Sequence, residues 1–128
     1  MDKTLNQNQP IYMQIMDKIR AAIVSGELQP GEKVAPVREL AEEFGVNPNT
    51  MQRALAELER EGLMKTERTS GRFVTKDIVR INQARKETGE AVVREFFYQM
   101  KALGFTKDQA EEFFRRMDAE EMGVLEVV

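Results

Sequence analysis

The sequence predicts a mainly helical fold with a small β-hairpin wing: a winged helix-turn-helix domain followed by a short segment of two helices. Three observations predict it. Apolar residues recur at helical spacing in several segments, only a few residues separate the second segment from the third, and two short extended runs flank a Thr-Ser-Gly turn. A chain of 128 residues has room for one compact domain and a short appendage. We therefore expect the winged domain over residues 1–75 and the helical segment over residues 76–128.

The first predicted helix begins at Pro10 and ends at Ser25-Gly26, because proline suits a first helical position and serine with glycine suits a stop. Its apolar residues keep to one face: Ile11, Ile15, Ile19, Ala22 and Ile23. Gln29-Pro30-Gly31-Glu32 predicts a type II turn, since proline fixes the first central φ and glycine accepts the positive φ of the second. A short extended piece is expected around Lys33-Val34.

Two further helices follow with almost no chain between them. The second begins at Pro36 and closes at Gly45, and its apolar residues form one face: Val37, Leu40, Ala41 and Phe44. The third restarts at Asn47, whose side chain can accept from free N–H groups, and Pro48 takes the first position, where a proline loses no hydrogen bond. Together the two helices predict a helix-turn-helix.

The third predicted helix ends at Gly62 and has two distinct faces. The apolar face holds Met51, Ala54, Leu55 and Leu58, and the opposite face with its flank holds Asn49, Gln52, Arg53, Ala56 and Arg60. Met64–Arg68 and Arg72–Thr75 are extended candidates around a turn at 69–71, which predicts a β-hairpin. A lone hairpin is marginally stable, so it must pack on the helices.

Residues after Lys76-Asp77 predict a long amphipathic helix with Gly89 as its weak point. Its apolar stripe comprises Ile78, Ile81, Ala84, Val92, Phe96, Met100 and Leu103. Gly104 is expected to end this helix, and Thr106 with Gln109 has the spacing of a capping box that starts another. The last helix carries its apolar residues on one side: Ala110, Phe113, Phe114 and Met117.

Composition excludes most enzyme chemistry. The chain has no Cys and no His, so disulfide scaffolds, zinc fingers, thiol nucleophiles and imidazole bases lose their usual residues. Carboxylate neighbours such as Glu111-Glu112 diverge on a helix, and solvation explains them better than catalysis. We expect no catalytic site, no cofactor and no metal.

Location follows from the same features. The apolar run at 21–24 is far too short for a membrane span, and the N-terminus lacks the basic-then-apolar order of a signal peptide. The absence of cysteine fits a reducing compartment. We therefore expect a cytoplasmic protein with no membrane partner.

The exposed face of the third predicted helix has the chemistry to read bases. Asn and Gln pair bidentately with adenine and Arg with guanine, which makes Asn49, Gln52 and Arg53 candidate readers in a major groove. Any solvated helix face also carries such residues, and a three-helix core can equally bind protein. Asn47 is expected mainly as the helix cap, with a phosphate contact beside that role.

Charge distribution favours DNA even though the formal net charge is −3. Phe44–Ala56 contains Arg53 and no acid, and Arg68–Lys76 contains three basic residues and no acid, so the expected groove-facing surface is locally positive. At the hairpin tip, Gly71 allows a close approach to a sugar-phosphate edge or the minor groove, and Arg72 beside it can neutralise a phosphate. A plain hairpin glycine would have the same pattern.

A nearly gapless pattern over residues 10–75 comprises Pro10–Ile15, Ser25–Val34, Val37–Ala41, Val46–Leu55, Leu58–Leu63 and Gly71–Val74. It resembles the GntR family of bacterial transcription regulators. The resemblance implies that Arg38 contacts the DNA backbone or a base and that Asn49 and Thr50 serve the recognition helix; from the sequence alone, Arg38 could equally pair with Glu42. The residues expected at DNA are Arg38, Asn47, Asn49, Thr50, Gln52, Arg53, Ser70, Gly71 and Arg72.

Three departures from the commoner family pattern affect this interpretation. The family usually has Ser or Thr then Arg at Asn47-Pro48, and Arg at Gln52, so the operators of better-known members cannot be copied to this chain. Ala35-Pro36 replaces the usual Pro-Ser and removes a polar cap, for which Pro36 can compensate by preorganising the first turn.

The short C-terminal part resembles the YtrA subfamily, since most family members carry a much larger effector-binding domain. Its apolar residues exceed what one short chain needs and predict a homodimer interface, although docking of the stripe on the winged domain is the alternative. The residues expected in the dimer interface are Val92, Phe96, Phe97, Met100, Phe113, Phe114 and Met117.

The predicted function is a homodimeric repressor that reads a two-fold symmetric double-stranded operator. The resemblance implies control of its own operon, often one that encodes an ABC transporter, and leaves any small-molecule effector open. The alternative is a winged-helix protein-interaction module that does not bind DNA.

Overall fold

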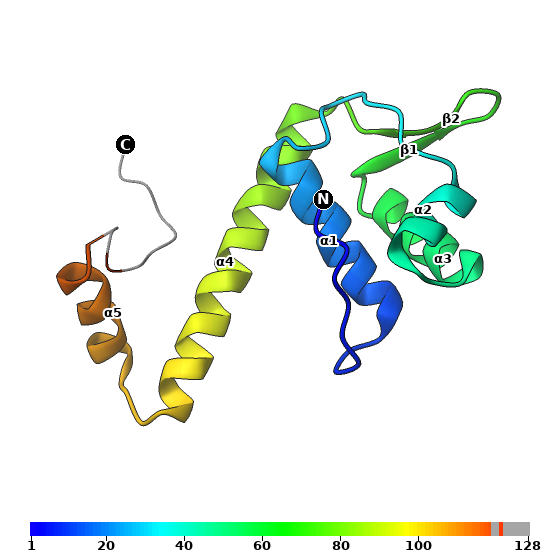
Figure 1. The fold of residues 1–128 in the computed structure, drawn as a ribbon. Helices are drawn as coiled ribbons and strands as arrows, with labels where there is room; N and C mark the ends of the chain where they lie inside the picture. The colour runs from blue at the N-terminus through cyan, green and yellow to red at the C-terminus, as the bar shows by residue number, and fades with distance from the viewer. Residues whose placement is uncertain (119–120, 122–128) are drawn as a thin grey trace. The chain divides into compact units, whose positions relative to one another are not determined.

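The computed structural model describes residues 1–118 and 121. It is mainly helical with one two-stranded antiparallel sheet, which confirms the predicted fold class. The chain divides into two compact units, Met1–Thr88 and Gly89–Val128. In chain order the elements are α1 (Ile11–Ser25), α2 (Val37–Phe44), α3 (Pro48–Arg60), β1 (Met64–Glu67), β2 (Gly71–Val74), α4 (Ile78–Ala102) and α5 (Lys107–Arg116) (Figure 1).

The predicted helix ends lie close to where the helices begin and stop. Gly26 and Gly45 end α1 and α2 with φ of 86° and 70°, a conformation that a residue without Cβ adopts freely. Pro48 is the first residue of α3, as predicted. Pro10 and Pro36 instead precede the first helical residue, because their ψ angles of 134° and 151° are extended.

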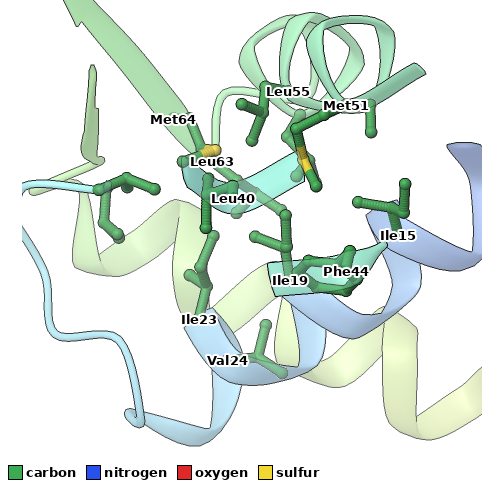
Figure 2. Packing of buried hydrophobic residues seen from close by; sticks show 14 of the residues in the cluster. Ile15, Ile19, Ile23, Val24, Leu40, Phe44, Met51, Leu55, Leu63 and Met64 are labelled. Carbon is green, nitrogen blue, oxygen red and sulfur yellow. The ribbon is translucent and has the colours of Figure 1, made fainter. Parts of the chain in front are cut away.

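Helices α1 and α2 both pack against α3 around one hydrophobic core (Figure 2). The apolar face predicted for α3 is buried, and Leu40 and Phe44 of α2 belong to the same cluster. Ile81 and Ala84 of α4 join it, so this unit includes the first turns of α4 as well as the wing. The largest fully buried side chains are Ile15, Ile19, Ile23, Met51, Leu55, Leu58, Leu63 and Val74.

The wing is a two-stranded hairpin supported by a third piece of chain. Strands β1 and β2 pair antiparallel with Met64 opposite Val74. The extended piece predicted around Lys33-Val34 forms an isolated bridge to Phe73, and the Val34 N–H donates to the Arg72 carbonyl oxygen at 2.9 Å. The wing is therefore fixed to the segment before α2, a pairing that the sequence did not predict.

The segment before α1 is anchored by a buried glutamine. Gln14 is 6% exposed, and its side-chain Oε1 accepts from the Asn6 N–H at 2.8 Å. Its Nε2 donates to the carbonyl oxygens of Asn6 and Gln9 at 2.7 and 2.8 Å. Asp2 accepts from Lys18 Nζ at 2.5 Å. These contacts hold the N-terminal segment against α1, so α1 enters the winged domain with its first turn supported.

The second unit contains the rest of α4 and α5. Gly104 lies in the turn that follows α4 and has φ 93°, and both hydrogen bonds of the predicted Thr106–Gln109 capping box are present. Gly89 does not interrupt α4, although it was the predicted weak point. Within the predicted α4 stripe, only Ile81 and Ala84 are buried, and Leu103 is 72% exposed. The stripe is therefore not a continuous buried seam within one chain.

Candidate nucleic-acid interface

Helix α3 presents a polar face to solvent because its apolar face is buried in the core. Asn49, Gln52 and Arg53 are exposed, and Thr50 is half-buried. Asn47 begins the helix, and its side-chain Oδ1 accepts from the Asn49 N–H at 2.8 Å. The predicted capping role of Asn47 is confirmed, whereas its phosphate contact stays a prediction.

Arg38 lies in the first turn of α2. This turn directly follows the segment around Lys33-Val34 that bridges to the wing. Its side chain is exposed. Among the described residues it makes no ion pair within 4.0 Å, so the alternative pairing with Glu42 is not formed. Its guanidinium is available for a ligand.

The tip of the wing exposes Ser70 and Gly71, and Gly71 is required there. Its φ is 111°, and an added Cβ would come within 3.2 Å of Lys33 Cε. An open hollow separates the wing from the start of α2. It is lined by Lys33, Val34, Ala35, Pro36, Val37, Thr66, Ser70, Gly71 and Arg72. Lys33 is an exposed cation at this hollow that sequence reasoning missed, because its position beside Gly71 depends on the long-range bridge to Phe73.

Arg72 differs from the other predicted contacts because an acid of α3 already holds it. Its Nε donates to Glu59 Oε1 at 3.2 Å, and its side chain is only 14% exposed. The Thr66 hydroxyl donates to the same carboxylate. This arrangement fixes β2 to the last turns of α3, and the predicted phosphate contact of Arg72 would have to use the remaining guanidinium N–H groups.

The acids at the far end of α3 are matched by arginines. Glu57 pairs with Arg60, and Glu61 accepts from Arg20 Nε at 2.9 Å and from a second guanidinium nitrogen at 2.6 Å. Among the described residues, no carboxylate lies within 4.0 Å of the cationic groups of Lys33, Arg38, Arg53, Arg68 and Lys76, whereas Arg72 pairs with Glu59. The local excess of positive charge expected at a DNA-facing surface stays a prediction.

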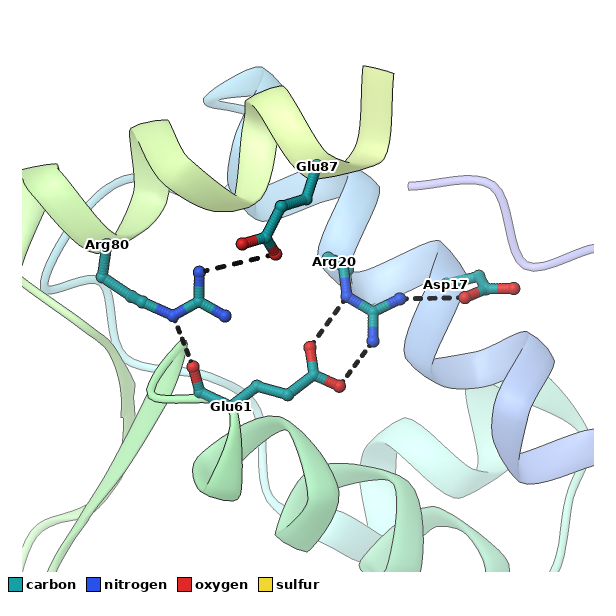
Figure 3. Close-up of polar contacts among 5 residues, drawn as sticks. All are labelled: Asp17, Arg20, Glu61, Arg80 and Glu87. Carbon is teal, nitrogen blue, oxygen red and sulfur yellow. Dashed lines mark hydrogen bonds and ion pairs between the residues drawn. The ribbon is translucent and has the colours of Figure 1, made fainter. Parts of the chain in front are cut away.

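Figure 3 shows how the end of α3 is held between α1 and α4. Arg20 of α1 makes the two bonds to Glu61 and a third to Asp17 at 2.9 Å, and Arg80 of α4 donates to the Glu61 carbonyl oxygen at 2.6 Å. Burial disfavours the charged Arg20, but the hydrogen bonds and charge of Glu61, with a smaller share from Asp17, outweigh it and raise the pKa of Arg20. The recognition helix is thus fixed at its C-terminal end.

At its N-terminal half, α3 is joined to α1 by an aromatic contact. Arg53 Cζ lies 3.7 Å from the centroid of the Tyr12 ring. Tyr12 belongs to the family-like stretch at residues 10–15, but the sequence alone predicted no functional role for it. Helical periodicity places residues on faces of their own helix, but it does not say which residue of a neighbouring helix they meet.

The residues predicted for a dimer interface form a partly exposed apolar surface in the second unit. Val92 is 65% exposed, Phe113 41% and Phe114 51%, and the other four are half-buried. The Phe96 and Phe114 rings lie 4.7 Å apart and link α4 to α5. Val93, Tyr98 and Leu103 are also exposed and were not predicted.

Two further properties of the described residues bear on function. No group of three or more His, Cys, Asp or Glu side chains among them is placed to hold a metal ion. None of the helices in the described part combines the length and the apolar character needed to cross a membrane.

Comparison with known proteins adds independent findings. Residues 11–74 match the model of the family described as bacterial regulatory proteins, gntR family. The chain is 39% identical over 109 residues to the HTH-type transcriptional regulator YhcF of Bacillus subtilis, which covers 85% of this chain and 90% of that protein. It is 41% identical over 68 residues to the HTH-type transcriptional repressor YtrA of the same organism, over 53% of this chain and 52% of that protein. The predicted likeness to YtrA is confirmed.

Solved structures agree with this result. A GntR family transcriptional regulator from Listeria monocytogenes matches with a TM-score of 0.79 and 35% identity, over 89% of this chain and 100% of that chain. AraR(DBD) in complex with operator ORX1 matches with a TM-score of 0.53 and 30% identity, over 56% of this chain and 93% of that chain. The second of these structures is a complex of AraR(DBD) with its operator.

Proposed function

Because this chain belongs to the GntR family of bacterial regulatory proteins, we propose that it acts as a homodimeric repressor that reads a two-fold symmetric operator. The chain is a DNA-binding transcriptional regulator and not an enzyme. What we propose beyond this is that the chain forms a dimer, that it represses transcription, and that particular residues read the bases.

The observation that carries the proposal is the exposed face of α3. It combines Asn49, Gln52 and Arg53 without a neighbouring acid that pairs with Arg53 among the described residues. These three side chains have the donor and acceptor patterns that distinguish adenine and guanine in a major groove. We assign Arg53 to guanine, and Asn49 and Gln52 to adenine.

The surrounding residues would fix the register on the DNA backbone. Phosphate contacts determine where a protein sits on the duplex without reading its sequence. We assign this role to Arg38 at the start of α2, to Thr50 and Asn47 at the start of α3, and to the wing. The wing residues are Ser70, Gly71 and Arg72, and Lys33 joins them because its side chain lies at Gly71.

The second unit supplies the proposed dimer contact. An exposed surface that contains Val92, Phe113 and Phe114 costs free energy in water, and burial against a second copy would remove that cost. A symmetric pair uses the same surface twice, so the two α3 helices would be presented to two operator half-sites. Half-sites one helical turn apart, roughly 34 Å, suit such a dimer.

The regulated genes follow from family resemblance. The family resemblance suggests control of its own operon, often one that encodes an ABC transporter, and the relative YtrA is named a transcriptional repressor. We propose the same arrangement here. A repressor acts where the chromosome is, so the proposed location is the cytoplasm.

Binding to a randomised duplex pool at two salt concentrations tests the proposal, with sequencing of the retained fraction. We expect enrichment of a two-fold symmetric site and a retention that falls steeply as salt rises, since cations on the protein displace counterions from DNA. Enrichment of a single half-site would contradict the dimer. No salt-dependent retention would contradict DNA reading and favour the alternative, a winged-helix module that binds protein.

A further inference from the structure

The contact between Tyr12 and Arg53 joins α1 to the middle of the proposed reading face. The guanidinium carbon lies 3.7 Å from the ring centroid, which is the distance of a stacked cation–π pair. We infer that Tyr12 is the positioning residue for Arg53 and holds its guanidinium in the orientation that reads one operator base pair. The inference rests on the proposed function and extends it to a residue outside the helix-turn-helix.

Stacking suits a reading arginine because it leaves the hydrogen-bonding edge free. The guanidinium is planar, and its five N–H groups point outward in that plane. Arg53 Cζ lies over the Tyr12 ring, whose face offers no oxygen or nitrogen acceptor, so the contact does not consume the donors that would pair with a guanine. In the described residues no carboxylate pairs with Arg53 within 4.0 Å, whereas Arg72 is already held by Glu59.

The ring itself is well held. Tyr12 is half-buried and packs against the core cluster, three residues before the fully buried Ile15. The buried Gln14 ties the same turn of α1 to the N-terminal segment through its three hydrogen bonds. A tyrosine has only two side-chain torsions to restrict, so it offers a rigid surface. Arg53 by contrast is exposed and long, and would otherwise lose much side-chain freedom on binding.

A double-mutant cycle on the selected operator tests the inference. The variants are Tyr12→Leu, Arg53→Ala and their combination, with Tyr12→Phe as the matched control that keeps the ring. We expect Tyr12→Phe to bind within about 2-fold of wild type and Tyr12→Leu to bind about 5-fold more weakly, the change that a cation–π pair of ordinary strength gives. In the Arg53→Ala background, Tyr12→Leu should have no further effect.

Base preference provides a readout that a general loss of stability would not move. Binding to operators substituted at each position in turn should show that Tyr12→Leu and Arg53→Ala relax preference at the same position. A loss spread evenly over all positions would make Tyr12 merely structural and overturn the inference. Equal harm from Tyr12→Phe and Tyr12→Leu would assign the effect to the hydroxyl and also overturn it.

A measurement without DNA keeps the inference testable if Tyr12→Leu unfolds. In NMR spectra, the ring should shift the Arg53 Nε–H resonance upfield of the usual arginine position in wild type and in Tyr12→Phe. The Arg53→Ala variant identifies the signal, because only that signal disappears. An unshifted resonance would overturn the stacking.

If wild-type protein selects no site from the duplex pool, the proposed function fails and this inference fails with it. If wild type selects a site but the cycle is additive, only the inference fails.

Discussion

The two units of the chain treat their apolar side chains in opposite ways. In Met1–Thr88 a cluster of large apolar residues is almost fully buried, as for Ile19 and Leu55 at 1% exposed, although Met13 of α1 is 45% exposed. Among the described residues of the second unit only Ala110 is buried, while Val92 is 65% exposed. The first unit therefore encloses a core of its own, whereas the second leaves large apolar side chains exposed, which is the surface that we propose for the dimer.

Charges show the same contrast. In the first unit, some ion pairs join different elements, as Arg20 with Glu61 and Arg72 with Glu59 do, beside pairs within one helix such as Arg60–Glu57. In α5 the pairs connect residues three or four positions apart on one helix: Lys107–Glu111, Arg115–Glu111, Arg115–Glu112 and Arg116–Glu112. Pairs of the first kind fix tertiary structure, whereas pairs of the second kind support the helix that carries them.

The largest expected effect is on the core of the first unit. Leu55→Ala removes a side chain that is 1% exposed, and the cavity left behind should lower the free energy of unfolding by about 2–5 kcal/mol. Urea unfolding followed by circular dichroism measures it. Leu103→Ala is the control, since that side chain is 72% exposed and should change stability by less than about 0.5 kcal/mol. Similar losses in the two variants would remove the contrast between the units.

The next effect concerns the apolar surface of the second unit. Val92→Asp places a charge on the proposed dimer interface, and burial of an unpaired carboxylate should weaken the dimer by about 2 kcal/mol or more, roughly 30-fold. Sedimentation velocity measures the dissociation, and unfolding of the first unit should be unchanged. The control is Glu90→Gln at a neighbouring exposed position. An unaltered dimer would show that another surface forms it.

How much the sequence predicted depends on whether a feature is local. The αL glycine at Gly45, the Asn47 cap and the Thr106–Gln109 capping box were predicted because each depends on residues a few positions apart. The placement of Asn49, Gln52 and Arg53 on an exposed face followed from helical periodicity. All of these features are set within one helix or one turn.

Contacts between elements were not predictable in the same way. The bridge from Lys33 to Phe73, the bond from Arg72 to Glu59 and the stacking of Arg53 on Tyr12 join segments whose relative placement results from core packing. Spacing in one segment carries no information on which residue of another segment it meets. Arg72 shows the consequence: its type and position favoured a free phosphate contact, yet Glu59 partly occupies it.

A smaller effect tests the long-range ion pairs. The charges of Arg20 and Glu61 are removed in Arg20→Gln, Glu61→Gln and the double variant. The double-mutant cycle should give an interaction free energy of about 1 kcal/mol in the free energy of unfolding, because both side chains are partly buried and the pair makes two hydrogen bonds. Urea unfolding of the four proteins measures it. Arg115→Gln in α5, where the side chain is 68% exposed, is the control and should be close to neutral. A coupling near zero would make the Glu61 contact dispensable.

The smallest effect concerns the N-terminal segment and depends on pH. The hydrogen bond from Lys18, followed by that from the Thr4 backbone N–H, lowers the pKa of Asp2 from 3.8 to about 2. A lowered pKa in the folded state stabilises the fold above pH 3.8, and this stabilisation is lost as pH falls toward 2. Asp2→Asn should therefore be slightly less stable than wild type at pH 6, and the two should converge at pH 2.

Urea unfolding at pH 6, 3 and 2 makes the comparison, with Lys18→Gln as the variant that removes the partner instead. Because Asp2 is exposed, solvent screens its charge and the difference should be modest. A difference that persists unchanged at pH 2 would show that Asp2 acts through something other than its charge. Convergence would show that the ionised Asp2 stabilises the fold through its charge, in a contact that joins the N-terminal segment to α1.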